Sequence, residues 1–146
     1  TMAKKILFTY RELFKAWRDL YAASVRQPRE NVNRLLLVYA IECGLKAVWL
    51  KQASRSLFDA DDISKTGHDL NEIIKQLHLG KRLSPQFDLA DAHDERHKRV
   101  PRKGNSVESL HQVWRYGGRL VAPVDDAGME AQLEAVHRLI EKELKS

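Results

Sequence analysis

An acid and a base lie four positions apart inside an apolar segment, and this pair is the strongest sign of chemistry in the sequence. Glu42 and Lys46 interrupt the stretch 35–50, which is otherwise rich in Leu, Ala, Val and Trp. On a helix, both charged side chains would lie on the apolar stripe near Leu35 and Trp49, and not on the polar side. Two explanations stay open. The pair is a structural i,i+4 ion pair, or it lines a polar cleft that faces a ligand, an RNA or another subunit.

Two further groups could join that cleft. His68 follows Gly67 near an expected helix start, where the helix dipole disfavours the imidazolium and leaves a neutral ring that can accept or donate a hydrogen bond. A histidine satisfied by a neighbouring helix is the alternative. Arg115 and Tyr116 follow Trp114, which is expected in the core, and a guanidinium beside aromatic rings can bind phosphate or stack on a base. The predicted ligand-binding residues are therefore Glu42, Lys46, His68, Arg115 and Tyr116.

A run of basic residues follows a run of acidic ones between positions 88 and 103. As a phosphate-contacting loop, the basic run would bind nucleic acid with an affinity that falls steeply with salt. As a mobile connector, its charges would balance the acids that precede it. The residues of this weaker nucleic-acid-binding candidate are Arg96, Lys98, Arg99, Arg102 and Lys103. His93 and His97 lie four positions apart, but no third ligand accompanies them, so we predict neither a metal nor another cofactor.

Length and composition limit the kind of protein that positions these residues. The chain has 146 residues, of which 43% are hydrophobic and 31% charged, enough for one folded domain without metal or disulfides. We place that domain at 2–146 and leave Thr1 outside it. The net charge of +5 permits an anionic partner without requiring one. Since Cys43 is alone and neither a signal peptide nor a membrane span is evident, we expect a cytoplasmic protein without membrane contact.

Apolar residues recur at helical spacing through most of the chain. Helices are expected over about 6–21, 30–53, 66–77, 105–117 and 126–144, with a weaker helical stretch beginning at Ser84 and Pro85. Acidic residues at 59–62 indicate a loop, and Pro101 and Gly104 would end any helix before them. Because no segment shows sustained strand alternation, the sequence predicts an all-α fold, an antiparallel, up-and-down bundle of about five helices.

Three of the segments above also carry a family resemblance. Residues 39–47 (Tyr-Ala-Ile-Glu-Cys-Gly-Leu-Lys-Ala), 67–70 (Gly-His-Asp-Leu) and 114–116 (Trp-Arg-Tyr) resemble the HEPN superfamily of small helical nucleotide-binding domains. The resemblance implies a helical bundle, frequent dimerisation, toxin–antitoxin or phage-defence settings, and RNA or nucleotide as ligand. Ribonuclease members carry Arg followed, after four to six residues, by His. No histidine of this chain has an Arg at that distance, so the family's usual proton donor and acceptor is missing.

The sequence therefore predicts a non-catalytic binding or accessory module that forms a homodimer. Its ligand would be RNA, a nucleotide or a protein partner such as a nucleotidyltransferase-like effector. In this hypothesis Lys46 and Arg115 meet anionic groups, Glu42 orients Lys46, and His68 forms a hydrogen bond. Two alternatives stay open. One is a metal-independent ribonuclease with an atypical active site, using His68 with Arg115. The other is a purely structural dimerisation or interaction domain, in which Glu42 and Lys46 only hold the bundle or a dimer interface together.

Overall fold

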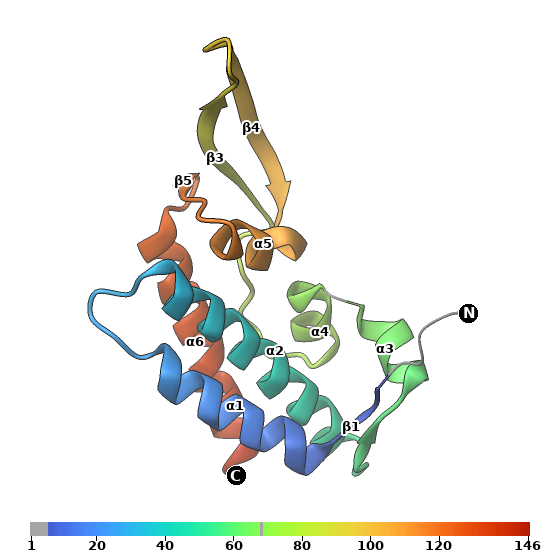
Figure 1. Ribbon diagram of the computed structural model, residues 1–146. Coiled ribbons are helices and arrows are strands. Elements are labelled where there is room, and N and C mark those ends of the chain that lie inside the picture. Colours follow the sequence, from blue (N-terminus) through green and yellow to red (C-terminus); the bar gives the residue numbers. More distant parts are fainter. Residues whose placement is uncertain (1–5, 68) are drawn as a thin grey trace.

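A computed structural model describes residues 6–67 and 69–146 of the chain (Figure 1). Its long helices are α1 (Tyr10–Ser24), α2 (Asn31–Gln52) and α6 (Asp126–Leu144). Its short helices are α3 (Ala60–Thr66), α4 (Leu70–Gln76), α5 (Leu110–Arg115) and a single 3₁₀ turn, η1 (Val107–Ser109). The strands are β1 (Phe8–Thr9), β2 (Leu57–Phe58), β3 (Gln86–His93), β4 (Arg99–Ser106) and β5 (Leu120–Ala122).

The presence of two antiparallel sheets shows that the all-α prediction, and with it the simple helical bundle, is wrong. One sheet is a pair of two-residue strands, in which Phe8 of β1 faces Phe58 of β2. The other has three strands in the order β4–β3–β5. The protein is therefore a mixed helix and sheet structure, in which α2 packs against α1, α4, α5 and α6. The β3–β4 hairpin projects away from the helices (Figure 1).

The hairpin occupies the stretch for which a weak helix was expected. Pro101 and Gly104 exclude a helix over residues 99–106, which form strand β4. Strand β3 pairs with β4, and Gln86 faces Ser106 at one end of the hairpin. Asp94 makes the turn, since its carboxylate accepts hydrogen bonds from the backbone N–H groups of residues 96 and 98. Long-range pairing therefore overrides the helix-like composition of residues 88–93.

The other helix predictions are confirmed in part. The helices expected at 30–53 and 126–144 are present as α2 and α6. The acidic loop expected at 59–62 is instead the start of α3, where Asp59 and Asp62 form a reciprocal capping box. The helix expected at 66–77 begins later, as α4, and Asp69 caps it because its carboxylate accepts from the backbone N–H groups of Asn71 and Glu72.

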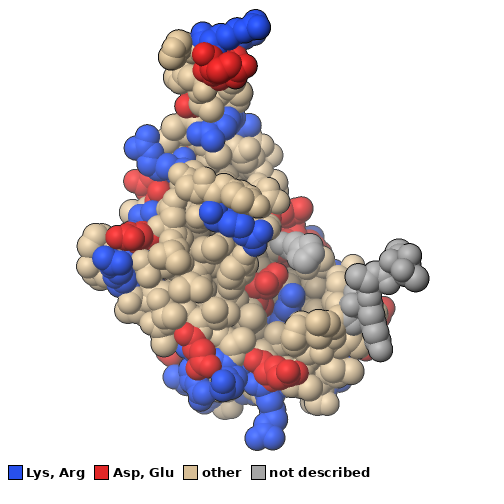
Figure 2. Space-filling view, in the orientation of Figure 1, with Lys and Arg blue, Asp and Glu red and all other residues tan. Residues whose placement is uncertain are grey.

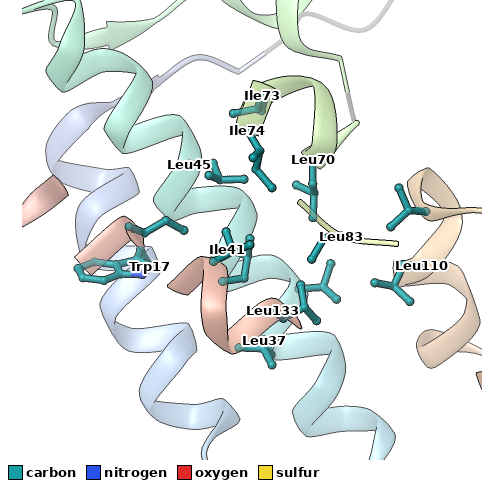
Figure 3. Packing of buried hydrophobic residues seen from close by; sticks show 14 of the residues in the cluster. Trp17, Leu37, Ile41, Leu45, Leu70, Ile73, Ile74, Leu83, Leu110 and Leu133 are labelled. Carbon is teal, nitrogen blue, oxygen red and sulfur yellow. The ribbon is translucent and has the colours of Figure 1, made fainter. Parts of the chain in front are cut away.

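The core forms around α2, which is apolar on most of its circumference. Leu37, Ile41 and Leu45 are fully buried and meet side chains from α1, α4, α5 and α6 (Figure 3). Gly44 allows the closest approach, since a Cβ atom there would lie 2.6 Å from Trp17 Cδ1 and 2.8 Å from Ile140 Cγ2. The long helices are thus held close together.

Charged side chains hold the start of α2 to α6. Arg29 Nη2 lies 2.5 Å from Glu134 Oε1 and Arg29 Nη1 lies 3.5 Å from Glu130 Oε1, while Arg34 Nε lies 2.7 Å from Glu130 Oε2. Arg34 also lies 3.6 Å from Asp126. These five largely buried residues form what we call the buried ionic cluster.

No helix of the described chain has the length and apolar character that crossing a membrane requires.

Candidate functional site

A cavity of about 570 Å³ opens between α2 and the η1–α5 segment, and we call it the α2–α5 cavity. Side chains of α2 form one wall and those of residues 106–115 the other, while α4 contributes a single leucine. Its lining residues are Val38, Tyr39, Glu42, Leu70, Ser106, Val107, Glu108, Ser109, His111, Gln112 and Arg115. The volume falls within the roughly 300–1,000 Å³ of small-ligand sites. Two of the five predicted ligand-binding residues, Glu42 and Arg115, therefore face one cavity.

The helix α5 is oriented by its buried face. Leu110, Val113 and Trp114 are buried, and the Trp114 indole N–H donates to Asp126 Oδ1 at 2.9 Å. Since residues four apart lie on one side of a helix, His111 and Arg115 project together from the other face into the cavity. The helix ends directly afterwards, because Gly117 adopts a left-handed backbone conformation with φ of 79°.

Arg115 reaches across the cavity to α2. Its Nη2 group donates a hydrogen bond to the Tyr39 hydroxyl, and its guanidinium carbon lies 6.0 Å from the centre of the Tyr116 ring. The bond to Tyr39 and the neighbouring Tyr116 raise the pKa of Arg115, which is therefore a permanent positive charge. Tyr116 itself lines an adjoining cavity of about 220 Å³, together with Arg102.

Glu42 and Lys46 form an ion pair at the edge of the site. Lys46 Nζ lies 3.7 Å from Glu42 Oε1, and the two side chains are 20% and 28% exposed. The ammonium group also lies 5.3 Å from the centre of the Phe58 ring, a cation–π contact. Glu42 lines the α2–α5 cavity, whereas Lys46 is not among its described lining residues. Neighbouring Cys43 is a protonated, unreactive thiol, because burial raises its pKa to about 11.

The other predicted residues lie elsewhere. His68 lies outside the described residues. The basic run is carried by the β3–β4 hairpin, where Arg99 pairs with Asp91 and Arg102 Nε donates to the Ala90 carbonyl at 2.8 Å. Basic and acidic groups stand side by side at the hairpin tip, so the hairpin presents no purely cationic surface on the face shown in Figure 2. Within residues 6–67 and 69–146, no three His, Cys, Asp or Glu side chains lie close enough together to hold a metal.

A second cavity, of about 670 Å³, adjoins the first. It lies over α4 and the loop that follows, and we call it the α4 cavity. Ser106 and Val107 line both cavities, so the two lie next to each other, and we call them together the extended groove. The α4 cavity also brings together the basic side chains of Lys75, Lys81 and Arg82.

Sequence reasoning missed several of these residues. Tyr39 is absent from the predicted ligand-binding residues, although it lies three positions before Glu42 on the same helix. His111 lies four positions before Arg115, the reverse of the order expected of a ribonuclease, and this spacing alone places both on one helix face. Lys81 and Arg82 gave a weaker signal, as adjacent basic residues in a loop after Gly80.

The chain matches no protein-family model, no curated protein and no solved structure. The fold and the site define a helix-rich mixed protein with an extended groove that runs from the central helix α2 to α4 and the loop after it. The resemblance to the HEPN superfamily stays a prediction, and so do the homodimer, the protein partner and the cytoplasmic location.

Proposed function

We propose that the α2–α5 cavity binds a ribonucleotide, free or as part of an RNA, and that the protein acts as a binding module. The observation that carries the proposal is the exposed Arg115 guanidinium, which is anchored to Tyr39 and lines a cavity of nucleotide size. An anchored arginine is a good phosphate ligand because its planar N–H groups are already oriented and its charge is permanent.

The remaining lining groups suit the rest of a nucleotide. The rings of Tyr39 and His111 offer faces on which a base can stack. Glu108 and Ser109 provide oxygens that can accept hydrogen bonds from ribose hydroxyls, the groups that distinguish RNA from DNA. Buried Val38 and Leu70 give the cavity an apolar floor. RNA or nucleotide is also the ligand class that the HEPN resemblance implies.

Arg115→Gln tests this proposal because it removes the charge and keeps much of the side chain. The matched control is Arg119→Gln, an exposed arginine that lies outside the described cavities. We expect Arg115→Gln to weaken binding of UMP, measured by calorimetry, by about tenfold or more, since charge-assisted hydrogen bonds contribute roughly 1.5–3 kcal/mol. The control should bind as the wild type does. Absence of UMP binding by the wild type, or equal affinities for the two variants, would refute the proposal.

A ribonuclease is the second candidate, and a specific observation favours it. His111 and Arg115 lie one helical turn apart on the same cavity wall. An imidazole can move the proton of a ribose hydroxyl, and a guanidinium can stabilise the charge that develops on the phosphate. Incubation of the protein with RNA in EDTA tests this activity. Cleavage by the wild type and by His93→Ala, but not by His111→Ala, would establish it. Intact RNA in all three samples would refute the ribonuclease and leave the binding module as the proposed function.

A further inference from the structure

The α4 cavity holds basic groups that the protein does not neutralise itself. Among the residues that the structure describes, Lys75, Lys81 and Arg82 form no ion pair and no side-chain hydrogen bond. The two acids of the same cavity accept hydrogen bonds from neutral N–H donors, so each keeps its negative charge. Asp69 accepts from the backbone N–H groups that begin α4, and Glu72 Oε1 accepts from Gln76 Nε2 at 3.0 Å. The three basic side chains outnumber the two acids, and no described carboxylate pairs with them, so the α4 cavity is a concave surface with an excess of positive charge.

The loop that carries Lys81 and Arg82 is held in place. The Asn71 side chain forms two hydrogen bonds with the backbone of Leu83, the residue that follows Arg82. It accepts from Leu83 N at 2.8 Å and donates to the Leu83 carbonyl at 2.9 Å. Leu83 is fully buried, and Ser84 N donates to Gln132 Oε1 at 2.7 Å. Because the backbone is fixed directly after the two cations, the loop does not have to be ordered by a ligand, which lowers the entropic cost of binding, while the exposed side chains of Lys81 and Arg82 keep their own freedom until they bind.

These observations extend the proposed function, on which this step rests. We infer that the extended groove binds one strand of RNA across both cavities. One nucleotide occupies the α2–α5 cavity with its phosphate at Arg115, and the strand continues over Ser106 and Val107. The phosphates of the adjacent nucleotides then lie against Lys75, Lys81 and Arg82. The strand is single, because a base that is paired and stacked in a duplex cannot enter a cavity without being extruded.

The test compares a short and a long ligand on the full chain. The short ligand is UMP, and the long one is a fluorescently labelled oligomer of about ten uridines, a length within the usual range for single-strand sites. The variant Lys81→Gln/Arg82→Gln removes two charges from the α4 cavity alone. The control Arg138→Gln/Lys142→Gln removes two exposed charges from α6, away from the described cavities. Circular dichroism verifies that each variant is folded.

We expect the α4-cavity variant to bind the oligomer about tenfold more weakly than the control does, with unchanged affinity for UMP. Its plot of log affinity against log salt should also be shallower by about 1.4, since each phosphate contact with a single strand contributes about 0.7 to the slope.

Each contrary result identifies which idea fails. If UMP binding depends on Arg115 but the α4-cavity variant binds the oligomer as the control does, the strand path is wrong and the proposed function stands. If a duplex of the same length competes as well as the single strand, the strand path is also wrong. If the wild type binds neither ligand, the proposed function fails and this inference fails with it.

Discussion

Two regions of the molecule bring basic side chains together, and they differ in whether those side chains form ion pairs. In the buried ionic cluster, Arg29 and Arg34 each contact two carboxylates of α6. In the α4 cavity, Lys75, Lys81 and Arg82 contact none among the described residues. The first set is largely buried, whereas the second is exposed.

This difference separates charges that serve the fold from charges that can serve a ligand. A buried cation must be neutralised by the chain, because removing it from water costs several kcal/mol. An exposed cation in a cavity needs no such partner, and its hydrogen-bond donors stay available to an incoming anion. Position along the sequence does not reveal the difference, since both sets read as ordinary charged residues between apolar ones.

Arg29→Met should give the largest effect on stability. The substitution leaves Glu134 largely buried with only the Tyr21 hydroxyl, 2.8 Å away, as partner among the described contacts. Losing one member of a buried pair typically costs about 3–5 kcal/mol, because the other charge is left uncompensated. Urea denaturation followed by circular dichroism measures this loss.

The double variant Arg29→Met/Glu134→Gln is the control for that experiment. It should recover part of the loss, since the isolated carboxylate is gone. Burial alone would raise the pKa of Glu134, but hydrogen bonds from Arg29 and Tyr21 outweigh it and hold the pKa below its usual value. A single variant as stable as the wild type would show that the cluster does not support the fold.

His137 should make the stability depend on pH, as the next largest effect. Its Nδ1 accepts from the Trp17 indole N–H at 3.2 Å, its ring stacks on Tyr21 at 3.4 Å, and burial lowers its pKa against the opposing fields of Glu134 and Glu141. Because the folded protein favours the neutral ring, its contribution is complete above the ordinary pKa of about 6.5 and is lost as the pH falls through the lower folded value.

The variant His137→Gln isolates the contribution of the His137 imidazole, because a glutamine side chain does not titrate. The free energy of unfolding of this variant should change less between about pH 7 and 5 than that of the wild type. His93→Gln, an exposed histidine of the hairpin, should keep the wild-type profile. Parallel profiles for all three proteins would assign the pH dependence to other groups.

The parts of the fold that could be predicted from the sequence are those set by local periodicity. The helices α2 and α6 follow from apolar residues at helical spacing, and Gly117 marks the end of α5. The hairpin could not be recognised this way. Its first strand has the composition of a helix, and it is a strand in the fold because it pairs with β4 on one side and with β5 on the other.

The candidate site shows the same limit. The helical position of Glu42 indicated a charge turned toward other elements, and Arg115 was identified from its aromatic neighbours; both line one cavity. The α4 cavity depends on contacts between distant residues. The loop that carries Lys81 and Arg82 is positioned by the hydrogen bonds of Asn71 with Leu83 and of Gln132 with Ser84. No sequence pattern predicts these bonds.

Lys46→Met tests an ion pair that is less buried than the buried ionic cluster and more buried than the cations of the α4 cavity. Glu42 and Lys46 are half-buried and 3.7 Å apart, so the loss of the ammonium should cost about 0.5–1 kcal/mol, well below the cost at Arg29. Thermal unfolding measures the loss, and UMP affinity shows whether it is only structural. A loss of stability with unchanged affinity would assign Lys46 to the fold, whereas weaker UMP binding would make it part of the site.

The smallest effect on stability is expected at the cations of the α4 cavity. Lys81→Gln/Arg82→Gln removes two adjacent positive charges that make no described ion pair, so the loss of attraction is negligible and some mutual repulsion is relieved. Its midpoint in urea should equal or slightly exceed that of the wild type, while its affinity for the RNA oligomer falls. A clear loss of stability would show that these charges support the fold after all, and the contrast with the buried ionic cluster would then disappear. Basic residues whose removal weakens RNA binding without weakening the fold are what a ligand groove requires.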